Sequence, residues 1–309
     1  MDLICAGEML IDFTPGNQPD TYTANPGGAP ANVAVSVARN GLNTAFLGVL
    51  GNDDFGKKLK KVLSEEGIEM LCPTLTDEAV TTLAFVTIYE GGERSFTFAR
   101  KPGADILLCK EDVLEDDIDR TRVLHAGSVS LSESPCREAI GYAMELAHKK
   151  KKLVSFDINY RDMIWHDADR CKKEVEKVLP YVDLLKISDE ELYFVGGEEN
   201  IPAFMEKYNI SVLVETLGSK GAKYFFGGKE GSVGAREVKA VDATGAGDAF
   251  WGGFLSKLMI LGVNKVDDVT EEIVQEALVY GNVSGGLCVQ KSGGIPALPT
   301  REEIEEVLK

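Results

Sequence analysis

The sequence predicts an α/β fold in which a doubly wound, mostly parallel central sheet is flanked by helices and carries a small extra β-sheet. From about residue 107 onward, short apolar segments alternate with longer segments of helical periodicity, the pattern of a parallel sheet with crossover helices. Acidic and amide side chains follow several predicted strands, where open sheets bind their ligands. Residues 81–99 depart from this alternation, because two β-rich segments flank Glu90-Gly91-Gly92-Glu93 as in a hairpin.

The overall composition is that of a globular protein. The chain has 309 residues, of which 44% are hydrophobic and 27% charged, enough for one large domain with a small appendage. No apolar run approaches the roughly 18 residues of a membrane span, and the N-terminus does not look like a signal peptide. We therefore expect a cytoplasmic protein. A net charge of −17 argues against nucleic acid and anionic membranes as partners, so any nucleotide site must be locally positive.

Cysteines and histidines are few and scattered. The six cysteines include no Cys-x-x-Cys pair, and only three histidines are present. Such spacing favours free, buried thiols over a disulfide framework or a zinc site.

The first elements follow from apolar runs and turn residues. Residues 3–6 form an apolar run that ends at Gly7, which indicates a buried strand. Residues 14–28 are rich in turn formers, and a helix opens directly after them with Pro30 in its first turn. The next strand and helix are expected at residues 44–50 and 55–66.

Candidate ligands accompany these first elements. Asp12 follows the first strand and is either a ligand for a hydroxyl group or an ordinary turn carboxylate. Gly27 and Gly28 leave open space before the helix, and Asn32 in the first helical turn can point into that space. A tight turn into a small-residue helix explains the two glycines but not the asparagine.

Further strands end in polar clusters. Asp157-Ile158-Asn159-Tyr160-Arg161 follows one strand, although Arg161 could instead pair structurally with Asp157 or Asp162. Ser188-Asp189-Glu190-Glu191 has the pattern of a capping box. The turn from Thr216 to Gly221 contains glycines that let a nucleotide approach. The remaining strands are expected at 123–126, 153–156, 183–187 and 212–215, a short hairpin at 224–226 and 232–235, and helices at 135–151 and 271–289.

Two regions emerge from this pattern. The predicted main α/β region comprises residues 1–12, 27–67 and 104–309. Residues 13–26 and 68–103 are predicted to form a small β-sheet that lies over the ligand cleft as a lid. The exposed edges and face of such a sheet also predict a homodimer.

The segment from Val241 to Phe250 carries the strongest chemical signal. Apolar residues recur at helical spacing after Asp248, so a helix begins near 245–247. Its free N–H groups and positive dipole end favour anions, and glycines let a ligand approach closely. Asp248 beside such a site suits a general base that deprotonates a hydroxyl while the amides stabilise a transferring phosphoryl group. The simpler alternative is that Asp242 and Asp248 are ordinary helix-start residues.

Several of these motifs resemble one family over nearly the whole chain. The segment from Asp242 to Asp248 resembles the C-terminal signature of the ribokinase-like (PfkB) sugar kinases, and residues 27–34 resemble their N-terminal signature. The pattern Phe-x-Phe-x-Arg-x-x-Gly-Ala-Asp ending at Asp105 and the end of the chain after Gly294 are similar to the fructokinase branch.

The resemblance implies an ATP-dependent kinase that converts D-fructose to fructose 6-phosphate at a primary hydroxyl, with Mg²⁺ and K⁺ as cofactors. Asp248 would be the general base, and the amides of Gly245, Ala246 and Gly247 would stabilise the phosphoryl group. The sugar would be held by Asp12, Gly27, Gly28, Asn32, Arg100, Arg161 and Asp248. The nucleotide side would include Lys186, Glu191, Thr216, Gly218, Gly221, Gly245, Gly247 and Asn282. K⁺ would lie near Asp242, Thr244, Cys288, Lys291 and Ser292, and Glu191 would help to place Mg²⁺, although Ser188 stands where the family has asparagine.

Alternative functions remain open at this point. A 2-keto-3-deoxygluconate kinase would use Arg161 on the substrate carboxylate, and ribokinase is a further alternative. A sugar- or nucleotide-sensing protein without catalysis would not need the base Asp248, so the intact Gly-Ala-Gly-Asp argues against it.

Overall fold

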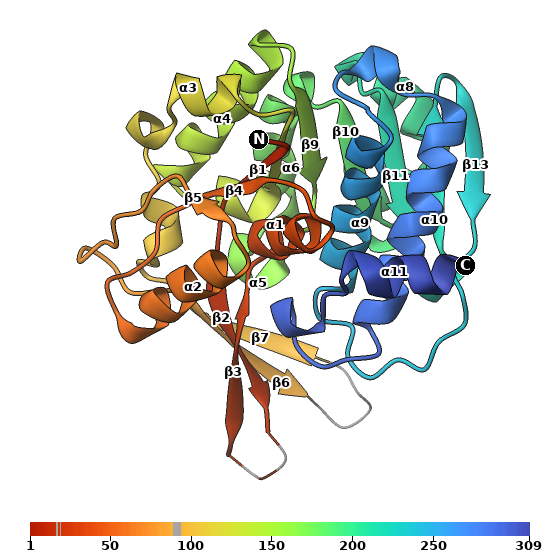
Figure 1. The fold of residues 1–309 in the computed structure, drawn as a ribbon. Helices are drawn as coiled ribbons and strands as arrows, with labels where there is room; N and C mark the ends of the chain where they lie inside the picture. Colours follow the sequence, from red (N-terminus) through yellow and green to blue (C-terminus); the bar gives the residue numbers. More distant parts are fainter. Residues whose placement is uncertain (17, 19, 89–93) are drawn as a thin grey trace.

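A large, mostly parallel sheet forms the centre of the molecule (Figure 1). The computed structural model describes residues 1–16, 18, 20–88 and 94–309. Within these residues, nine strands follow the order β13-β12-β11-β10-β9-β8-β1-β4-β5, with β12 and β13 antiparallel at one edge. The first strand therefore lies inside the sheet, between β8 and β4. The strands are β1 (Leu3–Ala6), β4 (Thr44–Leu47), β5 (Glu69–Met70), β8 (Val123–Gly127), β9 (Leu153–Asp157), β10 (Leu184–Ser188), β11 (Val212–Thr216), β12 (Ala222–Phe226) and β13 (Lys229–Val233).

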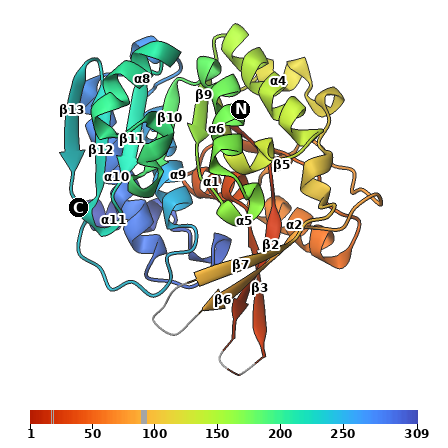
Figure 2. The same cartoon turned by 180° about the vertical axis from the view of Figure 1, so that it is seen from behind.

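Helices cover both faces of this sheet (Figures 1 and 2). Successive strand residues point to opposite faces, so Leu3 and Cys5 belong to one core and Ile4 and Ala6 to the other. The first core contains side chains of α1 (Ala29–Arg39), α2 (Asp54–Glu65), α9 (Ala246–Ile260) and α10 (Glu271–Cys288). The second contains side chains of α3 (Glu115–Asp119), α4 (Cys136–Lys149), α5 (Asp162–Trp165), α6 (Ala168–Val178), α7 (Leu192–Val195) and α8 (Ile201–Tyr208). This arrangement confirms the predicted doubly wound class.

A smaller sheet projects from one end of this body (Figure 1). It has the order β3-β2-β6-β7 in the described residues, and β2 pairs in parallel with β6. The predicted hairpin corresponds to β6 and β7, which pair antiparallel, whereas its expected turn at residues 90–93 lies outside the described residues. The strands are β2 (Leu10–Pro15), β3 (Tyr22–Gly27), β6 (Leu83–Ile88) and β7 (Arg94–Ala99).

The boundary between the two sheets differs from the predicted one at two places. The strand β5 pairs in parallel with β4 and so belongs to the large sheet, although residues 69–70 were expected in the small one. The strand β2 begins at Leu10, before the expected boundary at residue 13. The strand at 44–50 also ends early, at Leu47, and is followed by Gly48, where an added Cβ would lie 2.4 Å from the Gly7 carbonyl oxygen.

Helix α9 is fixed tightly to its surroundings. Its Trp251 is fully buried, and the Nε1 donates to Ser155 Oγ of β9 at 2.9 Å. A Cβ on Gly252 would lie 2.5 Å from the Ser36 Cβ of α1, so the close approach of the two helices requires glycine there. The helix starts at Ala246, within the predicted range. It is followed by α10 and by α11 (Arg301–Leu308).

Among the helices of the described residues, none combines the length and the apolar composition that crossing a bilayer would require.

Candidate active site

A cavity of about 320 Å³ lies at the carboxyl ends of β1, β8 and β9, beside the small sheet. Two distant parts of the chain meet there, the start of α1 and the start of α9. Its volume falls within the range of small-molecule sites. It is lined by Glu8, Leu10, Asp12, Gly28, Ala29, Asn32, Phe98, Val129, Asn159, Arg161, Ile164, Ala243, Thr244, Gly245 and Asp248.

Asp248 lies at the wall of this cavity in the first turn of α9. The helix begins after Gly245, whose φ of 75° is in the left-handed region that favours glycine. Asn32 Nδ2 donates to Asp248 Oδ2 at 2.7 Å. Burial raises the pKa of Asp248, while this hydrogen bond opposes the shift. A carboxylate with a raised pKa is a better proton acceptor.

Asn32 presents a second polar atom near the same point. Its Oδ1 is buried and has no hydrogen-bond partner among the described residues. A buried, unpaired acceptor costs free energy, so a ligand hydroxyl that donates to it would be favoured. The two functional atoms of Asn32 thus hold the carboxylate of Asp248 and provide an acceptor beside it.

The two glycines before α1 allow this placement. Gly28 has a φ of 107°, and an added Cβ would lie 2.6 Å from the Glu8 carbonyl oxygen. Gly27 does not line the cavity itself, but a Cβ there would lie 2.1 Å from Asp12 Oδ2. It therefore makes room for Asp12, which lies in the cavity wall on β2.

Two further carboxyl groups make the cavity sensitive to proton concentration. Burial and then the charge of Asp248 raise the pKa of Asp12 to about 7. Burial also raises the pKa of Glu8 to about 7, although Ser130 Oγ donates to its Oε2 at 2.5 Å. Near neutral pH these groups can therefore both donate to and accept from the hydroxyls of a polyol.

Arg161 and Arg100 lie in different parts of the structure, and only Arg161 lines this cavity. Arg161 is exposed at the cavity rim, where its Nη1 donates to the Tyr160 carbonyl oxygen at 2.9 Å. The structural alternative of pairing with Asp157 or Asp162 is not observed in the described residues, since Asp157 binds Lys186 at 2.8 Å and Asp162 accepts from the Tyr160 hydroxyl.

Arg100 does not line this cavity. It forms a buried ion pair with Asp105, 2.7 Å from Nη2 to Oδ2, and its Nη1 donates to Ser132 Oγ at 2.8 Å. Its side chain faces the adjoining cavity instead. The expectation that Arg100 holds the sugar therefore finds no support in the geometry, because Asp105 and Ser132 fix its guanidinium elsewhere.

The amides at the start of α9 are not equivalent. The Ala246 N–H donates to the Ala243 carbonyl oxygen at 3.2 Å and is thereby used within the turn. Within the part of the chain that the structure describes, no acceptor is paired with the N–H groups of Gly245 or Gly247. Of the three amides expected to bind the phosphoryl group, these two are therefore available to an anion at this helix end.

Lys186 and Glu191 lie behind this helix end. Lys186 Nζ is 3.5 Å from the position that a Cβ on Gly247 would take, and it binds Asp157 Oδ2. Burial lowers the pKa of Lys186, but the carboxylates of Asp157, Glu191 and Asp248 together raise it by more than burial lowers it. The net shift is therefore upward. Glu191 accepts from the backbone N–H groups of Tyr160 at 2.6 Å and Ser188 at 2.9 Å. The capping pattern at Ser188 is thus formed, and Glu191 connects two loops.

Only some of the other residues expected on the nucleotide side lie at the β11–β12 turn. Thr216 ends β11, and Gly218 is exposed in the turn with open space around it. Gly221 and Asn282 instead support the backbone after β13. A Cβ on Gly221 would lie 2.1 Å from the Val233 carbonyl oxygen, to which Asn282 Nδ2 donates at 3.0 Å.

The sequence as a whole is similar to known proteins. Residues 1–301 match the family described as pfkB family carbohydrate kinase. The chain belongs to the pfkB family of carbohydrate kinases. "Fructokinase-2" of Solanum lycopersicum is 40% identical over 99% of this chain and 96% of its own length.

Solved structures agree with this membership. A fructokinase with bound ATP from Xylella fastidiosa has a TM-score of 0.91 at 30% identity, covering 99% of this chain and 98% of that one. A double mutant of fructokinase from Vibrio cholerae, in a form with fructose, ADP and potassium ion bound, has a TM-score of 0.90 at 31% identity, covering 100% and 98% of the two chains. As a pfkB carbohydrate kinase, the protein is a phosphotransferase with an alcohol group of a sugar as acceptor.

In this pfkB kinase, the residues expected near a monovalent cation are brought together only in part. Asp242 accepts from Thr244 N and Oγ1 at 2.9 and 2.7 Å, and from Ser292 Oγ at 3.3 Å, so these three residues connect two loops. The Cys288 thiol faces the Thr244 carbonyl oxygen, and Lys291 Nζ binds Glu303 at 2.7 Å. Any contribution from Cys288 or Lys291 to a cation site must come from backbone carbonyls.

Glu8, Asn159 and Phe98 line the kinase cavity but were not among the predicted site residues. Glu8 and Asn159 follow the carboxyl ends of β1 and β9, and this position alone could have identified them. Phe98 lies on β7, and no signal in the sequence tells that its side chain faces the cavity rather than solvent.

The proton held by Glu8 leads to a prediction about stability. Because the folded pKa of about 7 is above the ordinary 4.5, the folded state binds more protons between these pH values, and stability falls as pH rises through that window. At 1.36 kcal/mol per unit, this group accounts for roughly 3 kcal/mol. We expect Glu8→Gln to flatten the decline in the free energy of unfolding between pH 5 and pH 8, measured by urea titration. An unchanged pH dependence in the variant would show that Glu8 is ionised throughout.

Proposed function

We propose that this kinase transfers the γ-phosphoryl group of ATP to the 6-hydroxyl of D-fructose and releases fructose 6-phosphate and ADP. The observation that carries the proposal is the carboxylate of Asp248, held by Asn32 at the N-terminus of α9 in a cavity suited to a hexose. The similarity to fructokinases over the whole chain supports fructose as the acceptor.

The proposed reaction needs positioning more than covalent chemistry. Asp248 accepts the proton of the sugar hydroxyl. The oxygen of this hydroxyl bonds to the γ-phosphorus, and the bond between the γ-phosphorus and the bridging oxygen of ADP breaks. The N–H groups of Gly245 and Gly247 donate to the phosphoryl oxygens, where negative charge must be stabilised. The unpaired Oδ1 of Asn32 accepts from a neighbouring sugar hydroxyl, and Asp12 and Glu8 bind others.

ATP is proposed to lie along the carboxyl ends of β10 and β11, near Thr216 and Gly218. Mg²⁺ would neutralise charge on the phosphates in such a reaction. Among the described residues, no three His, Cys, Asp or Glu side chains are grouped to hold a metal ion, and both oxygens of Glu191 already accept backbone N–H groups. The nucleotide phosphates and water would therefore supply most Mg²⁺ ligands, with Glu191 acting indirectly.

K⁺ is proposed beside the loop of Asp242, because the carboxylate, the Thr244 and Ser292 hydroxyls and nearby carbonyls form a set of hard oxygen donors. We expect replacement of K⁺ by tetramethylammonium to lower kcat about ten-fold, which corresponds to 1.4 kcal/mol. We also expect the activation to be weaker in Asp242→Asn. Titration with KCl at constant ionic strength measures the activation by K⁺ in both proteins. Equal rates with K⁺ and tetramethylammonium in the wild type would contradict the proposal.

The acceptor is tested by measuring ADP release with Mg-ATP and K⁺ on fructose, 2-keto-3-deoxygluconate, ribose and adenosine. A turnover on fructose that exceeds the others would support the proposal. Arg161 favours 2-keto-3-deoxygluconate as the second candidate, since its guanidinium at the cavity rim forms no ion pair with a described residue and can bind a carboxylate. Saturable binding of fructose without turnover on any acceptor would instead indicate a sensor.

The small sheet is proposed as a lid that closes over the sugar and excludes water. Its outer strands β3 and β7 have unpaired edges within the described residues, and Tyr22 on β3 is 51% exposed. These features support a homodimer through the small sheet, which sedimentation velocity would test. All six cysteines are free, in keeping with a reducing compartment such as the cytoplasm.

A further inference from the structure

Two charged residues of the pattern that ends at Asp105 have no place in the sugar cavity. Arg100 and Asp105 instead bind each other, and their side chains are only 8% and 1% exposed. Taking two charges out of water costs about as much free energy as their attraction returns, so a buried pair is weak evidence for stability. What such a pair can do is fix one geometry of the chain around it.

Asp105 binds both ends of the hairpin formed by β6 and β7. Its Oδ1 accepts from Thr82 Oγ1 at 2.5 Å, and its Oδ2 accepts from Arg100 Nε at 2.8 Å. Thr82 directly precedes β6, and Arg100 directly follows β7. One carboxylate thus holds both ends of the hairpin, and Thr82, Arg100 and Asp105 together form a hairpin anchor.

The hairpin anchor also reaches the segment that follows β8. Arg100 Nη1 donates to Ser132 Oγ at 2.8 Å, and Ser132 Oγ donates in turn to the Val129 carbonyl oxygen at 2.6 Å. Val129 lines the sugar cavity. The anchor leaves no room for a side chain on Gly103, where a Cβ would lie 1.9 Å from Thr82 Oγ1. It therefore connects the hairpin to a wall of the sugar cavity.

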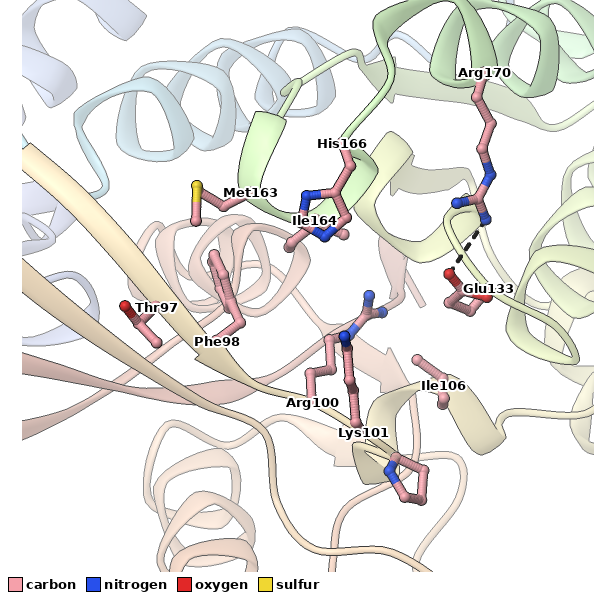
Figure 3. Close-up of a pocket in the computed structure, with 11 residues that line it drawn as sticks. Thr97, Phe98, Arg100, Lys101, Ile106, Glu133, Met163, Ile164, His166 and Arg170 are labelled. Atoms are coloured by element: carbon pink, nitrogen blue, oxygen red, sulfur yellow. Dashed lines mark hydrogen bonds and ion pairs between the residues drawn. The ribbon is translucent and has the colours of Figure 1, made fainter.

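The strand β7 depends on this anchor for its position. Within the described residues, β7 is an outer strand of the small sheet and pairs with β6 alone. Phe98 lies two residues before Arg100, and side chains at this spacing share one face of a strand. Figure 3 shows both side chains at this end of β7, and Phe98 lines the sugar cavity as well as the adjoining one of about 510 Å³. A shift of Arg100 would thus move Phe98.

We propose that Arg100 and Asp105 are positioning residues for the sugar, because their buried pair fixes the end of β7 and keeps Phe98 in place as a wall of the sugar cavity. Neither residue touches the sugar in this arrangement. A wall whose position is already fixed favours binding, since less chain freedom is lost when the ligand arrives. The inference rests on the proposed function in taking the cavity of Asp248 as the sugar site.

Two measurements on the full chain test the proposal, and one of them needs no sugar. Hydrogen exchange reports the protection of the amides of β7, and calorimetric titration without ATP reports the Kd of fructose. The variants are Asp105→Asn, Thr82→Val, Phe98→Ala and Asp105→Asn/Phe98→Ala. Glu66→Gln is the matched control, because Glu66 also pairs with an arginine, Arg39, at 2.5 Å but lines neither cavity.

We expect Asp105→Asn to speed exchange in β7 and to raise the Kd of fructose about ten-fold, with kcat near the wild-type value because Asp248 is unchanged. In the Phe98→Ala background, Asp105→Asn should raise the Kd by less than about two-fold, since effects that act through the same residue do not add. Glu66→Gln should lower the midpoint of urea unfolding without changing the Kd or the exchange in β7.

Thr82→Val keeps the test decisive if Asp105→Asn fails to fold. It removes one neutral hydrogen bond and retains the ion pair, so the variant should fold, exchange faster in β7 and bind fructose about three-fold more weakly.

Unchanged exchange in β7 in the folded anchor variants overturns the proposal, as does a rise in Kd that is equally large with and without Phe98. Faster exchange in β7 in Glu66→Gln would show a general loss of stability and would also overturn it. A failure of the proposed function looks different, because the wild type would then release no ADP with fructose, while the exchange in β7 would still decide on the anchor.

Discussion

Replacement of Asp248 by asparagine is expected to lower kcat for the sugar by about 10²- to 10⁴-fold, the usual contribution of a general base. Asparagine keeps the shape of the side chain and the contact with Asn32, so KM for the sugar should change little. Burial raises the pKa of Asp248, so the wild-type rate should fall toward acidic pH as the carboxyl group becomes protonated. Steady-state kinetics across pH on both proteins measure these effects.

A matched control separates catalysis from helix capping. Asp54 also lies in the first turn of a helix, α2, but its side chain is fully exposed and remote from the cavity. Asp54→Asn should leave kcat unchanged and cost little stability, because the effect of the helix dipole on an exposed charge is small. If Asp248→Asn kept a kcat within a few-fold of the wild type, Asp248 would be a helix-start residue and not the base.

Loss of the Lys186 ammonium group is expected to be the largest effect on stability. Lys186 and Asp157 form a buried pair at 2.8 Å, with side chains 7% and 3% exposed. Lys186→Met would leave Asp157 as a buried charge without its partner, which costs about 3–5 kcal/mol. Urea unfolding should show a clear fall in the transition midpoint.

The double variant Lys186→Met/Asp157→Asn serves as the decisive comparison. It removes both charges, so most of the lost stability should return. The surface pair of Lys223 with Glu198 offers a further control, since both side chains are at least one-third exposed and Lys223→Met should cost less than about 1 kcal/mol. A loss below that value in Lys186→Met would mean that water or a neighbouring group stabilises Asp157.

Local patterns in the sequence predicted most of the strands and helices and identified Asn32 and Asp248 as candidate site residues. The alternation after residue 107 corresponds to the parallel strands from β8 to β11, and the helix expected near 245–247 begins at Ala246. Both signals depend on residues that are neighbours in the chain, where periodicity and glycine placement act directly. Asn32 and Asp248 could be predicted for the same reason, each from its own helix start.

Features that depend on tertiary pairing could not be predicted in this way. The side chain of Arg100 turns toward Asp105 and Ser132, and nothing in the order of residues shows which cavity it faces. Likewise Asn282 and Gly221 support the same backbone after β13, although they lie far apart in sequence. The short strand β5 carries too few residues for a pattern, and its pairing with β4 appears only in the structure.

The hydrogen bond between Asn32 and Asp248 joins residues 216 positions apart, and this separation matters while the protein is being synthesised. At about 5–20 residues per second, a ribosome needs roughly 10 to 40 s to make the intervening chain. In the folded protein β1 lies between β4 and β8. On the ribosome, the edge of β1 that pairs with β8 has no partner until residues 123–127 have been synthesised. If the sugar binds as proposed, its complete site forms only after α9 has left the ribosome, and one edge of β1 lacks its partner β8 until residues 123–127 have been made.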